Sequence, residues 1–281
     1  VRRLSEGSLV RLGIGSKQRR IIAAETDQTS VVGETIAQDK ELTRGLLEEA
    51  GIPVAKGKPV FSAEEAWQVA TEIGLPVVIK PRCGNQGRGV SVGLTTQDEV
   101  FEAYSVAISE EEEVVVERCL AGDDYRLLVI GGELVAAARR CAPCITGDGS
   151  STIEKLVQKE NRNPRRCDDH AGSLSLLCLD AAAEVALREQ GFSKESVPND
   201  GQLVLLRRNA NLSTGGTAED VTDLVHPHTI RLAIDAVRVV GLDIAGVDIM
   251  ATRIDQPLSA QHGGVVEINA CPGLRMHLEP T

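Results

Sequence analysis

Two short apolar segments near the end of the chain carry oxygen-bearing side chains. Asp248 stands within residues 246–250, and Glu267 and Asn269 stand within residues 265–269. Because side chains alternate along a strand, Glu267 and Asn269 are expected on the same side. A carboxylate on an apolar strand is costly unless it is paired or binds a cation. Oxygen ligands from two strands suit Mg²⁺ bound together with nucleotide phosphates, and the alternative is strand-end carboxylates in water.

A lysine and a glycine-rich loop form a second candidate site. Lys80 lies in the apolar segment 77–81, where its ammonium group needs an anion if it is buried. The loop that follows, with the spacing GxxGxG, contains Gly84, Gly87, Arg88 and Gly89. Backbone N–H groups of such a loop can bind phosphates, so phosphate is the predicted anion. The alternatives are a plain turn and a lysine that reaches the surface.

Composition excludes several classes of partner. The chain has 281 residues, 42% of them hydrophobic and 25% charged, and a net charge of -11. The negative charge argues against a nucleic-acid backbone, and an aromatic content of 2% removes the stacking surfaces of single-strand binders. No apolar run of about 18 residues is present, so no membrane span is predicted. The basic stretch 162–166 is interpreted as a solvated turn.

Seven cysteines are spread along the chain. Their odd number, and their positions in apolar segments, predict free thiols in a reducing cytoplasm. Cys141 and Cys144 have CxxC spacing, with Cys167, His170 and Cys178 downstream. One such pair is a weak signal for zinc or redox chemistry, so incidental cysteines in an insertion are the alternative.

Hydrophobic periodicity and turn residues predict a mixed α+β chain. Helices are expected at 29–47, 62–73, 97–108, 152–161, 179–190 and 226–240. Strands are expected at 58–61, 77–81, 90–92, 114–118, 124–130, 133–139 and 203–206, besides the two segments described first. The stretch at about 141–205 is interpreted as an insertion, and the strand 203–206 is expected to return to the core.

Together these segments resemble the ATP-grasp fold, in which two α+β lobes clasp ATP under a glycine-rich lid hairpin, here with a helical insertion. Several segments are similar, more specifically, to the cyanophycin synthetase family. They are 19–20, 25–27, 38–40, 84–87, 124–127, 205–216 and 269–277. The resemblance extends from about Arg19 to Thr281.

The resemblance implies a domain organisation. Residues 1–20 would be a linker from a missing N-terminal domain, 21–74 a first lobe and 75–116 the lid lobe. Residues 117–281 would form the C-terminal lobe, with the insertion at about 141–205. A Mur-ligase-like domain would follow residue 281.

It also implies a role for each matching residue. The ATP phosphates would contact Lys40 and Lys80. The hairpin that closes over ATP would contain Gly84, Gly87, Arg88 and Gly89, and Glu117 would lie beside the adenine or ribose. Mg²⁺ would be held by Asp248, Glu267 and Asn269. The growing polymer would contact Arg126, Ser213, Gly215 and Gly216, and Glu34 would engage an arginine branch. The acyl phosphate and its tetrahedral successor would be stabilised by Arg208 and Asn211.

The implied activity is ATP-dependent addition of aspartate to the C-terminal carboxylate of cyanophycin, in a cytoplasmic enzyme that assembles into homo-oligomers. One alternative is condensation of β-aspartyl-arginine dipeptides, as in cyanophycin synthetase 2. Others are a glutathione-synthetase-like or glutamate-adding ligase, and an inactive nucleotide-binding scaffold. Cys83 departs from the acidic residue expected at that position, which puts rate or substrate in doubt rather than fold.

Overall fold

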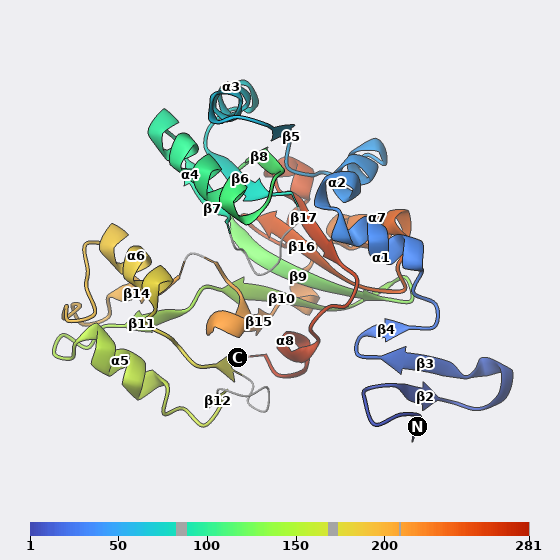
Figure 1. The fold of residues 1–281 in the computed structure, drawn as a ribbon. Coiled ribbons are helices and arrows are strands. Elements are labelled where there is room, and N and C mark those ends of the chain that lie inside the picture. Colours follow the sequence, from blue (N-terminus) through green and yellow to red (C-terminus); the bar gives the residue numbers. More distant parts are fainter. Residues whose placement is uncertain (83–88, 168–173, 208, 281) are drawn as a thin grey trace. The chain divides into compact units, whose positions relative to one another are not determined.

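The computed structural model describes residues 1–82, 89–167, 174–207 and 209–280. The chain forms two compact units (Figure 1). The first comprises Val1–Ala137 and Thr222–Gly273, and the second comprises Ala138–Val221 and Leu274–Thr281.

An antiparallel sheet covered by two helices forms one part of the first unit (Figure 1). Its strand order is β5 (Gly57–Val60), β8 (Val114–Arg118), β6 (Val77–Pro81) and β7 (Ser91–Leu94), and the helices are α3 (Ala63–Ile73) and α4 (Gln97–Glu110). The predicted strands 77–81 and 114–118 are confirmed without change. Their buried valines and isoleucine pack against both helices, and the indole of Trp67 joins this core.

Local capping fixes where these two helices begin. The Ser62 hydroxyl accepts a hydrogen bond from the Glu65 N–H at 3.1 Å. The Glu65 carboxylate reaches back to the Phe61 N–H at 2.8 Å rather than to the N–H of Ser62. In α4, Thr96 and Glu99 form the full reciprocal capping box.

The second sheet of the first unit carries most of the predicted site. Its neighbouring strands are β10 (Glu133–Cys141), β9 (Asp123–Ile130), β16 (Ile244–Ala251) and β17 (Gly264–Asn269). β9 and β10, expected at 124–130 and 133–139, are neighbours in this sheet, and both glycines between them have positive φ angles, 59° for Gly131 and 81° for Gly132. β10 continues into the second unit beyond Ala137.

Helices that contact the strands β9, β16 and β17 include α1 (Val31–Gln38), α2 (Lys40–Glu49) and α7 (Pro227–Val240). The single helix expected over 29–47 is wrong, because the chain breaks at Asp39, whose φ and ψ are -92° and 100°. The Asp39 carboxylate accepts hydrogen bonds from the first N–H groups of α2 and so begins a new helix. His226 caps α7, since its Nδ1 accepts a hydrogen bond from the His228 N–H at 3.1 Å.

The first unit also contains a small antiparallel sheet at its N-terminal end and short 3₁₀ turns. The strands are β1 (Arg2–Arg3), β2 (Val10–Leu12), β3 (Arg19–Ile22) and β4 (Glu25–Thr26). The 3₁₀ turns are η1 (Gly15–Lys17), η3 (Thr222–Leu224) and η4 (Leu258–Ala260).

The second unit has its own apolar core, which includes Ile153, Leu187 and Leu206. Its elements are β11 (Cys144–Thr146), α5 (Ile153–Glu160), β12 (Arg166–Cys167), β13 (Leu174–Ser175), α6 (Ala181–Glu189), β14 (Leu203–Leu205), η2 (Leu212–Thr214), β15 (Thr217–Asp220) and α8 (Arg275–Leu278). The strand expected at 203–206 does not rejoin the large sheet. It pairs with β11, because Val204 and Leu206 bury their side chains in this local core.

In the described ranges, no helix combines the length and the apolar composition that crossing a membrane requires.

Candidate active site

Three predicted site residues lie in one row across the second sheet. Asp248 on β16 pairs with Arg126 on β9 and, on its other side, with Glu267 on β17. Residues directly opposite one another in antiparallel strands share a face of the sheet. The strand register therefore brings together side chains that are far apart in the sequence.

Arg126 and Asp248 form a bidentate ion pair. The Nη2 of Arg126 donates to Oδ2 of Asp248 at 2.8 Å, and its Nε donates to Oδ1. Both residues are buried, with exposed fractions of 8% and 5%. A Cβ at Gly246 would lie 2.9 Å from the Arg126 Cδ, so glycine there leaves room for the arginine. The predicted polymer-binding arginine thus contacts a predicted metal ligand directly.

Asn269 is the third predicted metal-binding residue on this face. It pairs with Gly246, two residues from Asp248, and its Nδ2 lies 3.5 Å from the Asp248 Oδ2. Among the residues that the structure describes, no group of three or more His, Cys, Asp or Glu could hold a metal ion. Two carboxylates and an amide oxygen nevertheless fit Mg²⁺, which commonly takes one or two carboxylates and completes its shell with phosphate oxygens and waters.

Lys80 and Glu117 form a second buried ion pair, on the neighbouring strands β6 and β8. The Lys80 Nζ lies 2.7 Å from the Glu117 Oε1, and each residue is 8% exposed. The anion predicted to accompany a buried Lys80 is therefore a carboxylate in this structure. Gly57, opposite Glu117 on β5, leaves space for that carboxylate, because a Cβ there would lie 2.5 Å from the Glu117 Cγ.

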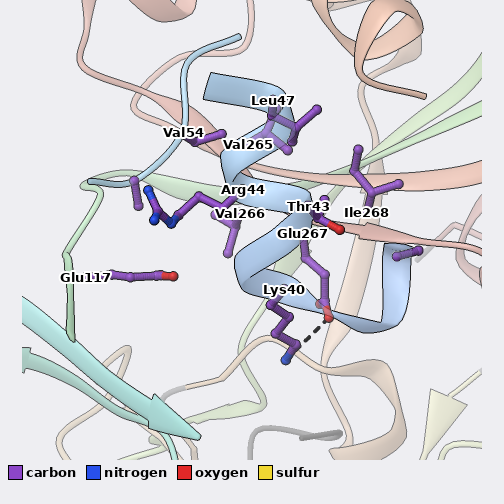
Figure 2. Close-up of a pocket in the computed structure, with 12 residues that line it drawn as sticks. Lys40, Thr43, Arg44, Leu47, Val54, Glu117, Val265, Val266, Glu267 and Ile268 are labelled. Atoms are coloured by element: carbon purple, nitrogen blue, oxygen red, sulfur yellow. Dashed lines mark ion pairs between the residues drawn. The ribbon is translucent and has the colours of Figure 1, made fainter. Parts of the chain in front are cut away.

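A pocket is lined by one member of this pair, Glu117, and by one member of the row on the sheet, Glu267 (Figure 2). Its polar lining includes Lys40, Arg44, Glu117 and Glu267, and its apolar lining includes Leu47, Val54, Ala55, Val265, Val266 and Ile268. The Lys40 Nζ lies 3.5 Å from the Glu267 Oε1. An apolar wall with a few convergent charged groups is typical of a small-molecule site.

Arg44 is a pocket residue that sequence reasoning missed. It follows Lys40 by one helical turn, so the spacing Lys40, Arg44, Leu47 could have indicated a common face of α2. Its hydrogen bond to Glu41 raises the pKa of Arg44 against the effect of burial, and Glu117 contributes further. Val54 was missed as well, because its contact with β17 is a single bridge to Val265.

Asn211, predicted to stabilise the acyl phosphate, lies in the second unit around η2, together with the predicted substrate residues Ser213, Gly215 and Gly216. The Asn211 Oδ1 accepts from the Ser213 N–H at 3.1 Å, so this side chain caps the 3₁₀ turn. Gly215 has a φ of 96°, which a residue with a side chain would adopt only under strain. A Cβ at Gly216 would meet the Cys141 carbonyl at 2.8 Å.

Arg166 supports this loop from within the second unit. Its Nη1 donates to the carbonyls of Ser175 at 2.8 Å and of Gly215 at 3.2 Å. Arg166 is only 7% exposed, so the interpretation of 162–166 as a solvated turn is wrong for this residue. Its charge is satisfied by carbonyls and by Glu160.

The remaining predicted residues are placed as follows. Glu34 lies in the first turn of α1, where its carboxylate accepts from the Gln38 side chain at 3.3 Å. Gly89 has a φ of 68° and lies close to Pro81. Outside the described residues are Cys83, Gly84, Gly87, Arg88, Arg208 and His170.

The described cysteines are free thiols, and none joins a metal cluster of described residues. Burial raises the pKa of Cys144, and the nearby Cys141 adds to this effect. Burial also raises the pKa of Cys119. Cys178 and Cys271 are exposed.

We therefore expect an aromatic disulfide reagent at pH 7.5 to label Cys178 and Cys271 at least about tenfold faster than Cys119 and Cys144, because the thiolate is the reactive form. Mass spectrometry of a labelling time course would measure the order. Rapid modification of Cys144 would contradict it.

Comparison with known proteins agrees with this geometry. Residues 39–126 match the family model of the carbamoyl-phosphate synthase L chain, ATP binding domain. Residues 198–279 match the model of the RimK-like ATP-grasp domain. The two matches contain the row on the sheet and the lysine–glutamate pair. Together the two matches span more than half of the chain and indicate an ATP-grasp module.

Relatives of this ATP-grasp chain include cyanophycin synthetases. It is 43% identical to that of Geminocystis herdmanii and 41% identical to that of Synechocystis sp., each over 99% of this chain and 32% of the relative. It is 33% identical to the glutathione biosynthesis bifunctional protein of Clostridium perfringens, over 92% of this chain and 34% of that protein. The chain thus spans about a third of the length of these relatives.

A solved relative supports the fold. The crystal structure of a bifunctional glutathione synthetase from Pasteurella multocida superimposes with a TM-score of 0.70 at 31% identity, covering 99% of this chain and 39% of that one. The predicted ATP-grasp fold is thereby confirmed.

Proposed function

We propose that this ATP-grasp module activates the C-terminal carboxylate of cyanophycin as an acyl phosphate and joins L-aspartate to it. The observation that carries the proposal is a set of neighbouring charged side chains at the pocket. Lys40 lies beside Glu267, Glu267 is the cross-strand neighbour of Asp248, and Asp248 is the cross-strand neighbour of Arg126. Similarity to cyanophycin synthetases over 99% of the chain supports the choice of substrate.

The predicted site residues would perform three tasks. Lys40 and Lys80 would bind ATP phosphates, with Lys80 exchanging its contact to Glu117 for one to phosphate. Asp248, Glu267 and Asn269 would hold Mg²⁺, which when bound neutralises charge on the phosphoryl group. Arg126 would bind the polymer carboxylate, because a guanidinium group matches the geometry of a carboxylate.

The chemistry needs no protein nucleophile. A carboxylate oxygen of the polymer end attacks the γ-phosphorus of ATP, and ADP leaves. The amine of aspartate then attacks the acyl carbon, loses a proton, and expels phosphate, which retains the carboxylate oxygen. Because water would hydrolyse the acyl phosphate, the apolar pocket wall and the buried ion pairs favour the transfer by limiting access of solvent.

A second candidate is a ligase for another amino acid or for a dipeptide. The relatives named for glutathione biosynthesis favour it, since they align with 92% of this chain. A β-aspartyl-arginine dipeptide is the alternative within cyanophycin synthesis.

Phosphate release from ATP and Mg²⁺ by the full protein, with a short cyanophycin primer, separates these candidates. Aspartate, β-aspartyl-arginine, glycine and glutamate would be offered in separate reactions. We expect release with aspartate. Release with the dipeptide alone, or with another amino acid alone, would replace the proposed substrate, and ATP binding without release in any reaction would favour an inactive scaffold.

A further inference from the structure

Asp39 uses its two carboxylate oxygens for two different purposes. Its Oδ1 accepts hydrogen bonds from the N–H groups of Glu41 at 3.1 Å and Leu42 at 3.0 Å, which begins helix α2. Its Oδ2 accepts from the Nη2 of Arg82 at 3.0 Å. One side chain therefore joins the start of a helix to a residue 43 positions later in the chain.

Arg82 is fixed on its other side as well. Its Nη1 donates to the Glu113 Oε2 at 2.5 Å, and its backbone N–H donates to the Glu113 carbonyl at 2.8 Å. Glu113 directly precedes β8, and Arg82 directly follows β6, so this contact lies where the end of β6 pairs with the start of β8. The Arg82 guanidinium group joins these strand ends to Asp39.

The Asp39–Arg82 contact lies near both predicted phosphate-binding lysines in the sequence. Lys40 directly follows Asp39, and Lys80 comes two residues before Arg82. Lys40 extends from the first turn of α2, and Lys80 extends from β6. The Asp39–Arg82 pair is thus close in the chain to both groups assigned to phosphate.

Both partners stay charged at neutral pH. Partial burial alone would raise the pKa of Asp39, but hydrogen bonds from the Leu42 N–H and from Arg82 outweigh it and hold that pKa below its usual value. The hydrogen bonds to Glu113 and Asp39 raise the pKa of Arg82. The two side chains therefore carry opposite charges at neutral pH.

We propose that Arg82 is a positioning residue, which holds α2 against the end of β6 so that Lys40 and Lys80 meet the same polyphosphate. The inference rests on the proposed binding of ATP. Arg82 itself touches neither lysine in any described contact. It acts through Asp39, whose carboxylate fixes the first turn of α2.

The exposed fractions of the two side chains distinguish a positioning role from a role in global stability. The side chains of Arg82 and Asp39 are each 31% exposed, and partly exposed pairs contribute little to global stability. Loss of the pair should therefore hardly change the unfolding temperature. Misplacing one lysine relative to the other should weaken the binding of polyphosphates and leave the nucleoside contacts intact.

The test compares Arg82→Gln, Asp39→Asn and the double variant with the wild-type protein by calorimetric titration. The ligands are a non-hydrolysable ATP analogue and adenosine. Asp39→Asn keeps a side-chain oxygen for the helix cap. We expect each single variant to bind the analogue about tenfold more weakly, as misplacement of a binding group implies, with adenosine affinity unchanged. The double variant should lose no more than either single variant, because the two residues act as a unit.

Glu113→Gln and Arg82→Lys extend the test. Glu113→Gln should have a smaller effect, since it leaves the contact to Asp39, and Arg82→Lys should recover part of the affinity. Unchanged analogue affinity in Arg82→Gln, equal loss for adenosine, or additive losses would overturn the positioning role. If the wild-type protein binds no ATP analogue, the proposed function fails together with this inference, whereas binding that is insensitive to Arg82 removes this inference alone.

Discussion

Replacing Lys80 with methionine is expected to weaken ATP binding and to destabilise the fold at the same time. Loss of a charged contact to phosphate should raise the dissociation constant about 10- to 100-fold, since such contacts are worth about 1.5–3 kcal/mol. The variant also leaves Glu117 buried without its ammonium partner, which should lower the free energy of unfolding by about 3–5 kcal/mol. Urea unfolding and calorimetric titration with ATP measure the two effects separately.

The chain offers a matched control for the stability effect. Lys58 on β5 pairs with Glu72 at 2.8 Å, but these side chains are 54% and 60% exposed. Lys58→Met should change the free energy of unfolding by less than about 1 kcal/mol. The double variant Lys80→Met/Glu117→Met should regain stability without regaining ATP affinity. Recovery of both properties would mean that Lys80 acts on ATP only through the fold.

Replacing Arg126 with methionine is expected to have a comparably large effect at the sheet. Asp248 would remain buried without its bidentate partner, so the free energy of unfolding should fall by about 3–5 kcal/mol. Because the oxygens of Asp248, Glu267 and Asn269 remain, Mg²⁺ should restore part of the stability and raise the unfolding temperature more than in the wild-type protein. Thermal unfolding with and without Mg²⁺ measures this difference.

An exposed pair just after β16, the strand that carries Asp248, is the control. Arg253 also binds Asp255 through two hydrogen bonds, at 2.9 and 2.6 Å, but the side chains are 61% and 45% exposed. Arg253→Met should therefore change stability little and give no added response to Mg²⁺. If Arg126→Met responds to Mg²⁺ no more than Arg253→Met does, Asp248 is not a metal ligand.

Local patterns predicted the individual elements well. The strand 77–81 is an apolar run bounded by Gly74 and by a glycine-rich loop, and its limits in the structure are the predicted ones. The helix that begins after Ser62 follows from a capping pattern within four residues. In both cases the deciding interactions are close in the sequence, so the sequence contains the information needed.

Features that depend on distant contacts were not predicted. The break between α1 and α2 has no glycine or proline to mark it, and Asp39 is held by Arg82, 43 residues away. Arg126 and Asp248 were each assigned a role, but their ion pair follows from β9 lying beside β16. A partner 122 residues away is invisible to local periodicity.

Transfer of an isotope from the polymer carboxylate to phosphate tests the central claim most directly. A cyanophycin primer with ¹⁸O in its C-terminal carboxylate would be incubated with the protein, ATP, Mg²⁺ and aspartate. An acyl-phosphate intermediate predicts that each released phosphate carries one ¹⁸O atom, because phosphate departs with a carboxylate oxygen. Unlabelled phosphate, released while aspartate is consumed, would contradict activation of the carboxylate by phosphorylation.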